Sequence, residues 1–105
     1  MDDFKVIFRI LKALQKAMDE EEIDEKMLTH EKLGISQPRW SRIMAMLVKN
    51  GYIEGVTVES WDNLPLPFIE FYKPEITLKG LEYLAENSLM RKIANAGKEV
   101  MDILK

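Results

Sequence analysis

One short stretch of the chain carries basic side chains and no acidic ones. Residues 36 to 50 (SQPRWSRIMAMLVKN) contain Arg39, Arg42 and Lys49 but neither Asp nor Glu. Guanidinium and ammonium groups pair with phosphate oxygens, and an arginine can also hydrogen-bond the edge of a base. Over its 105 residues the chain has a net charge of −3, which is the wrong sign for coating nucleic acid non-specifically. Any contact with DNA must therefore come from a local patch such as this one.

Helical spacing predicts which side chains of this stretch are exposed. Apolar residues that recur three and four positions apart share one face of a helix, and that face packs on the core. On a helix from Gln37 to about Asn50, the residues of this face are Trp40, Ile43, Met44, Leu47 and Val48. The opposite face carries Pro38, Ser41, Arg42, Ala45 and Lys49, with Arg39 and Met46 at its edge. Trp40 is therefore predicted to be a core residue rather than a stacking platform for bases.

The residues before this helix predict a second, shorter helix and a tight turn. Thr29 can cap a brief helix over residues 30–33, and Gly34 can adopt the positive φ that ends it. Ser36 is a good N-cap for the longer helix, whose first turn tolerates Pro38 because no backbone N–H is required there. Just upstream, Met27-Leu28 is expected to form a very short strand.

Two strands are predicted after the longer helix, from Tyr52 to Ser60 and from Phe68 to Lys73. Both contain β-branched or aromatic residues that alternate with polar ones. The intervening WDNLPLP is too long for a tight hairpin, and its two prolines favour an extended loop. We call residues 52–73 the wing.

The charge of the wing is opposite to that of the basic stretch. From Gly51 to Tyr72 the chain has no Arg or Lys, and its charged residues are Glu54, Glu59, Asp62 and Glu70. DNA phosphates would repel such a wing. A protein partner that docks on exposed apolar residues is therefore the alternative role for it, and the candidates are Trp61, Leu64 and Leu66.

Amphipathic helices are expected at both ends of the chain. From Phe4 to Met18, apolar residues cover so much of the helix circumference that contacts on more than one side are expected. A helix from Leu78 to about Asn87 should turn three leucines inward: Leu78, Leu81 and Leu84. A final helix from Leu89 to Leu104 has the heptad-like spacing Ile93, Ala96, Val100 and Ile103 or Leu104. This last helix either docks on its own subunit or joins the Phe4–Met18 helix in a homodimer interface.

Composition excludes several classes of site. The chain has no cysteine and one histidine, His30, which excludes zinc-finger, thiol and histidine-rich metal chemistry. No apolar run is long enough to cross a membrane and no signal-peptide pattern is present, so a cytoplasmic protein is expected. The acidic residues between 19 and 25 lack the spacing of a calcium loop and are interpreted as solvated. No serine has a histidine beside it in its segment, so no enzyme is expected. No glycine-rich loop that could cradle a phosphate is present, and no cofactor is expected.

The order of these elements resembles that of a winged helix-turn-helix domain. The stretches LGIS, RWSRIMAMLVKNGYIEG and ITLKGLEYL resemble bacterial winged-helix regulators of the MarR and PadR kind. Over nearly its full length, from MDDFKVIFRILKALQKAMDE to ITLKGLEYLAENSLM, the chain is similar to the small YjcQ-like family of bacterial and phage or prophage genomes. The resemblance implies one mostly helical α+β domain over residues 1–105, with a two-stranded wing and additional C-terminal helices.

The winged-helix resemblance also implies a surface for double-stranded DNA. The longer helix would lie in the major groove, and the matching positions here are Gln37, Arg39, Ser41, Arg42, Ala45 and Lys49. Gln37 and Arg42 suit base edges, whereas Arg39, Ser41 and Lys49 suit phosphate oxygens. The leading hypothesis is a sequence-specific DNA-binding regulator that acts as a homodimer. The alternative is a winged-helix module that binds a protein and no DNA.

Overall fold

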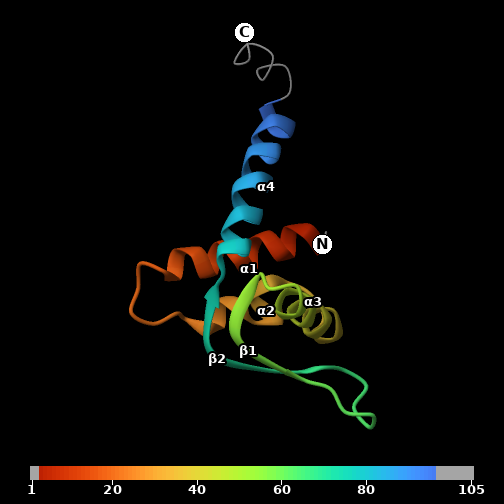
Figure 1. Cartoon of the computed structure of the whole chain (residues 1–105). Helices are drawn as coiled ribbons and strands as arrows, with labels where there is room; N and C mark the ends of the chain where they lie inside the picture. Colours follow the sequence, from red (N-terminus) through yellow and green to blue (C-terminus); the bar gives the residue numbers. More distant parts are fainter. Residues whose placement is uncertain (1–2, 97–105) are drawn as a thin grey trace.

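The computed structural model describes residues 3–96 of the chain, and it has a mostly helical α+β fold with a two-stranded antiparallel sheet, which is consistent with a winged-helix-like arrangement. Its elements are α1 (Asp3–Ala17), the 3₁₀ helix η1 (Glu25–Leu28), α2 (His30–Leu33), α3 (Gln37–Lys49), β1 (Ile53–Glu59), β2 (Phe68–Ile76) and α4 (Leu78–Ala96). Figure 1 shows α1 lying across the base of α4, with α2, α3 and the β1–β2 hairpin on the other side of α1.

The core forms where α1 meets α3 and the base of the hairpin. Its buried residues are Val6, Ile10, Leu11, Leu14, Leu28, Leu33, Ile43, Met44, Leu47, Ile53, Val56, Ile76 and Leu84. On α1 the predicted amphipathic helix is confirmed, but Val6 and Ile10 are fully buried while Phe4 and Met18 are exposed. Phe4 lies in the first turn of α1 and Met18 directly follows its last residue.

The predicted turn between α2 and α3 is confirmed at each of its signals. The Thr29 hydroxyl accepts a hydrogen bond from the Lys32 N–H at 3.3 Å, and Gly34 ends α2 with φ of 73°. The Ser36 hydroxyl then accepts one from the Arg39 N–H, also at 3.3 Å. These caps satisfy backbone donors that a helix leaves free at its start, so local chemistry fixes where both helices begin.

Three expectations about local structure are wrong. Met27-Leu28 is not a strand but belongs to η1, whose start is capped by the Asp24 carboxylate at 3.1 Å from the Lys26 N–H. No break separates two helices near Asn87, because α4 runs continuously to Ala96. Leu78 is 73% exposed rather than inward, since it occupies the first position of α4, before the helix reaches the core. The heptad-like residues from Ile93 onward lie outside the described side chains.

The hairpin is divided by an irregularity in its register. Ile53 pairs with Ile76 and Glu54 with Glu75, but Val56 pairs with Phe71, so β2 has two extra residues at this point. Gly55 has φ of 73°, and a Cβ there would lie 2.1 Å from the Lys73 carbonyl oxygen. Opposite it, Lys73 has φ of 53°, which is rare for a residue with a side chain. A β-bulge of this kind bends the strands.

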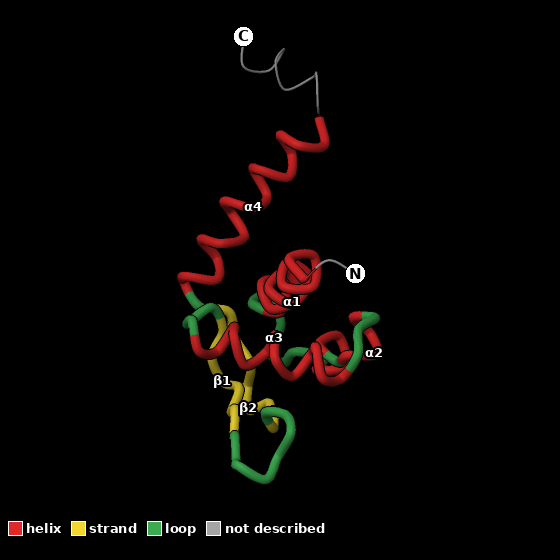
Figure 2. Tube along the Cα trace, turned by 90° about the vertical axis from the view of Figure 1, so that its right-hand side faces the viewer, coloured by secondary structure: helices red, strands yellow, loops and turns green. Residues whose placement is uncertain are grey.

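Beyond the bulge the hairpin forms an arm, which we define as residues 56–71. Figure 1 shows the arm extending away from the core beneath α3, and Figure 2 shows its loop at the end opposite to α4. Two expectations for the wing are therefore confirmed in outline, since two antiparallel strands enclose a loop over WDNLPLP. The second strand extends further than expected, to Ile76.

Trp40 joins α3 to two other elements. Its indole Nε1 donates a hydrogen bond to the Leu28 carbonyl at 2.7 Å, and its ring meets the edge of the Phe71 ring at 6.0 Å between centroids. The predicted place of Trp40 on the core-facing side of α3 is confirmed, although the side chain is only partly buried and packs at the margin of the core.

We expect Trp40→Ala to lower the free energy of unfolding by about 3 kcal/mol, because the change removes a large ring and leaves a cavity. Trp61→Ala is the matched control, since Trp61 is 53% exposed in the loop of the arm, and its effect should stay within about 0.5 kcal/mol. Urea melts of both variants measure the difference. Equal losses for the two tryptophans would contradict the role assigned to Trp40.

Candidate nucleic-acid interface

The exposed face of α3 is a stripe in which basic side chains flank an apolar one. Arg42, Met46 and Lys49 follow one another at spacings of four and three residues, so they are neighbours on one side of the helix. All three side chains are exposed, and Met46 retains 50% of its accessible surface. We call these three residues the α3 stripe.

The structure exposes four of the six predicted DNA-binding residues and not the other two. Gln37, Arg39, Arg42 and Lys49 are exposed. The expected exposure of Ser41 is wrong, because its residue is 3% exposed, and Ala45 is half-buried. Ser41 precedes two core-facing residues, Met44 and Val48, by three and seven positions. Helical spacing thus places its small side chain at the edge of the packed face, where it is covered.

Arg39 forms an ion pair with Asp3. Its Nη1 contacts the Asp3 Oδ1 at the start of α1, and both side chains are about half exposed. The carboxylate occupies one side of the guanidinium that was predicted to meet a phosphate. Because both groups keep access to water, the pair contributes little to stability and leaves Arg39 able to exchange partners.

Arg9 of α1 fixes the position of the turn from behind. Its Nη1 donates to the Leu33 carbonyl at 3.3 Å, and its Nη2 donates to the Lys32 carbonyl at 3.2 Å. These carbonyls belong to the last residues of α2, which have no partner within the helix. A guanidinium at a helix C-terminus is also favoured by the helix dipole. Sequence reasoning missed Arg9, whose only signal was a cation inside the apolar pattern of α1.

The arm presents acidic and apolar side chains to solvent. Its three carboxylates, Glu59, Asp62 and Glu70, are exposed, as is Glu54 at its base. Among the predicted apolar residues Trp61 and Leu64 are exposed, whereas the expectation for Leu66 is wrong because this residue is partly buried beside the prolines of the loop. Two large exposed side chains on β2 were not predicted: Phe68 at 48% and Tyr72 at 74%.

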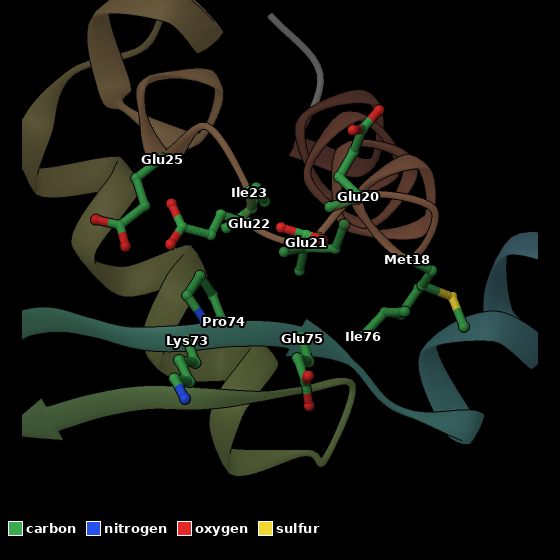
Figure 3. Close-up of a pocket in the computed structure, with 12 residues that line it drawn as sticks. Met18, Glu20, Glu21, Glu22, Ile23, Glu25, Lys73, Pro74, Glu75 and Ile76 are labelled. Carbon is green, nitrogen blue, oxygen red and sulfur yellow. The ribbon is translucent and has the colours of Figure 1, made fainter.

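A second surface feature is a groove of about 820 Å³ between β2 and the loop after α1. Figure 3 shows carboxylates from this loop along one side of the groove and Lys73, Pro74 and Glu75 of β2 along the other. Five glutamates line it: Glu20, Glu21, Glu22, Glu25 and Glu75. In the part of the chain that the structure describes, no three His, Cys, Asp or Glu residues are grouped so that they could hold a metal ion.

Within residues 3–96, no helix combines the length and the apolar character needed to cross a membrane.

Comparison with known families identifies the chain. The family model described as YjcQ protein matches residues 8–103, which is nearly the whole sequence and includes α3 and the arm. The chain belongs to the YjcQ family. The similarity to this family that was inferred from the sequence is therefore confirmed. No curated protein and no solved structure matches the YjcQ chain.

We expect the Asp3–Arg39 pair to contribute at most about 1 kcal/mol to folding, since exposed ion pairs are screened by water. A double-mutant cycle with Asp3→Ala and Arg39→Ala measures the coupling directly from urea melts. A coupling of about 2 kcal/mol or more would show that Arg39 is held by Asp3 and is not free to contact a ligand.

Proposed function

We propose that this YjcQ-family chain is a small sequence-specific DNA-binding protein, a transcriptional regulator of bacterial or prophage origin. The observation that carries the proposal is the exposed basic face of α3, on which Arg39, Arg42 and Lys49 stand in a stretch without acidic residues. A helix of this kind fits the major groove of B-DNA. The Ser36 cap fixes its first turn, and Arg9 holds the end of α2 that precedes it.

Each exposed residue of α3 has a distinct role in this proposal. Arg42 and Gln37 can hydrogen-bond base edges, Arg42 in the paired fashion that favours guanine. Lys49 and Arg39 neutralise phosphates, and Arg39 does so by exchanging the Asp3 carboxylate for a phosphate oxygen. The Met46 side chain offers an apolar contact between the two cations of the α3 stripe. Ser41 has no role, because it is buried.

A homodimer would place two such helices on one duplex. Symmetric dimers bind half-sites about one helical turn apart, which doubles the number of phosphate contacts. Exposed apolar residues at the ends of α1 and at the start of α4 support an interface there: Phe4, Met18 and Leu78 are 69%, 61% and 73% exposed. The heptad-like spacing that begins at Ile93 extends the same apolar character toward the C-terminus.

The acidic arm favours a second candidate function, a protein-interaction module that binds no DNA. The arm cannot grip phosphates as basic wings do, because residues 51–72 contain no Arg or Lys. Its exposed Trp61, Leu64 and Phe68 are instead suited to contact a protein. Titration of the purified protein with its own upstream DNA and with random DNA separates the two functions. Selective binding supports the regulator, and indifference to both DNAs supports the interaction module.

We expect Arg42→Glu to abolish DNA binding, because it replaces a contact with a repulsion at the centre of the basic face. In the parent dimer, Arg39 and Lys49 of both subunits make about four phosphate contacts, which predict a slope of log affinity against log salt of about −3.6. Fluorescence titrations at several salt concentrations measure both effects. Lys16→Glu, on the last turn of α1, makes the same change in charge away from α3 and is the matched control.

Two outcomes would contradict DNA recognition by α3. One is an Arg42→Glu variant that binds as tightly as the parent, and the other is a parent whose affinity does not depend on salt. The thermal melt of Arg42→Glu must match that of the parent within the range of about 0.5 kcal/mol that exposed substitutions show.

The dimer is tested by placing charges in the heptad-like spacing. We expect Ile93→Asp combined with Val100→Asp to convert a dimer to a monomer, because carboxylates in an apolar interface lose their water without gaining a partner. Light scattering of both proteins at high salt gives their masses. A parent that is already monomeric under these conditions removes the dimer from the proposal.

A further inference from the structure

We propose that the α3 stripe of one copy of this protein binds the outer face of the arm of a second copy, in a reciprocal contact that competes with DNA. The outer face of the arm consists of Thr57, Glu59, Phe68 and Glu70. The contact itself requires no DNA binding, and only the competition rests on the function proposed above.

The register of the arm defines its two faces. Thr57 is opposite Glu70 and Glu59 is opposite Phe68, and residues opposite one another project to the same side of a sheet. These four residues are exposed. The alternate residues of the arm, which include Val56 and Phe71, face the domain, where Phe71 contacts Trp40. The outer face is therefore turned away from the core of its own chain.

The outer face has an aromatic ring that is a neighbour of two carboxylates. Glu59 lies directly across from Phe68, and Glu70 is two positions along the same strand from Phe68. Glu59 and Glu70 are thus diagonal neighbours, about 7–8 Å apart. Phe68 is a neighbour of both carboxylates and lies beside the diagonal that joins them, where it is 48% exposed. The outer face therefore offers one apolar ring with a carboxylate on each of two sides.

The α3 stripe offers the complementary groups, two cations and one apolar side chain. Arg42 and Lys49 flank Met46, and the seven residues from the first to the last span about 10 Å along a helix axis. Flexible basic side chains easily accommodate the small difference from the spacing of the two carboxylates. Met46 would then meet Phe68, a favourable sulfur–aromatic contact. Each cation would meet one carboxylate, and Arg42 can also lie over the ring.

The partner is a second copy because each chain has both surfaces and does not join them itself. Among the described residues no salt bridge links the arm to α3, since Arg39 pairs with Asp3 and the His30 ring contacts the carboxylate of Glu31. In a two-fold symmetric pair, the stripe of each copy meets the arm of the other, so every contact is made twice. Both sets of unpaired charges are satisfied by the same arrangement.

This arrangement gives the acidic arm a binding partner, whereas the phosphates of a DNA duplex would repel it. The outer face carries the same sign of charge as the phosphates, and it would occupy Arg42 and Lys49 as they do. Self-association and DNA binding are therefore alternatives for one surface. DNA at sufficient concentration would dissociate the pair by binding only the free α3 stripe.

Charge exchange between the two surfaces tests the contact. One variant reverses the stripe, Arg42→Glu with Lys49→Glu, and another reverses the outer face, Glu59→Lys with Glu70→Lys. A quadruple variant combines all four substitutions. Sedimentation gives the masses of the two double variants, of their equimolar mixture and of the quadruple variant. The measurements run from about 0.1 to 1 M NaCl, over which the Debye length falls from about 10 to 3 Å. All four positions are exposed, and thermal melts check the fold.

We expect the mass of the parent to increase at low salt because two copies associate. This association step should disappear at high salt. In each double variant the affinity of this association should fall by roughly tenfold or more, because attraction becomes repulsion across the contact. The mixture and the quadruple variant should both regain the association step, since each again brings opposite charges together. Association through apolar residues of α1 and α4 would persist at high salt and is thereby distinguished.

The proposal is overturned if the parent shows no salt-dependent association step. It is also overturned if neither the mixture nor the quadruple variant regains this step. DNA titration of the same proteins separates this inference from the proposed function. If the step and its rescue are present and no DNA binds, the self-contact stands and the regulator is rejected. If DNA binds without any such step, the regulator stands and the self-contact is rejected.

Discussion

The position of Trp40 determines how the two surfaces of this protein are presented. Its indole is tied to the Leu28 carbonyl and its ring packs against Phe71, so one side chain connects α3, η1 and the arm. With Trp40 fixed on the inner side of α3, helical geometry requires the α3 stripe to face outward. With Phe71 fixed on the inner face of the arm, strand alternation turns Glu59 and Glu70 outward. The opposite charges of the molecule are therefore separated by the packing of one aromatic pair.

Elements with local signals could be predicted from the sequence. The start of α3 follows from Ser36 and Pro38, and the end of α2 follows from Gly34, because each of these residues acts on its own backbone. Predictions failed where the outcome depends on distant parts of the chain. Whether a leucine at position 78 is inward depends on where α4 meets the core, and no pattern within the helix contains that information. Met27-Leu28 is a different case, because its 3₁₀ helix begins at a local cap, Asp24, which the prediction of a strand did not take into account.

The candidate site was predictable in its charge and less so in its geometry. An acid-free stretch with helical spacing correctly placed Arg42 and Lys49 on the surface. Ser41 was misplaced because it lies on the boundary of the apolar face, where the neighbouring element decides whether a small side chain is covered. The roles of Arg9 and Asp3 could not be predicted, since their partners are 24 and 36 residues away in the chain. Contacts of this range require the fold to be known.

The bulge at Gly55 and Lys73 also separates two parts of the hairpin whose backbone hydrogen bonds should open at different rates. Before the bulge, Ile53 and Ile76 are buried in the core, so their backbone hydrogen bonds should open only when the domain unfolds. Beyond it, the arm has partly or fully exposed residues on both faces except at Val56. Its amide protons should therefore exchange with solvent through local opening, many times faster than those of the hairpin base. The two halves of one β-hairpin would belong to different cooperative units.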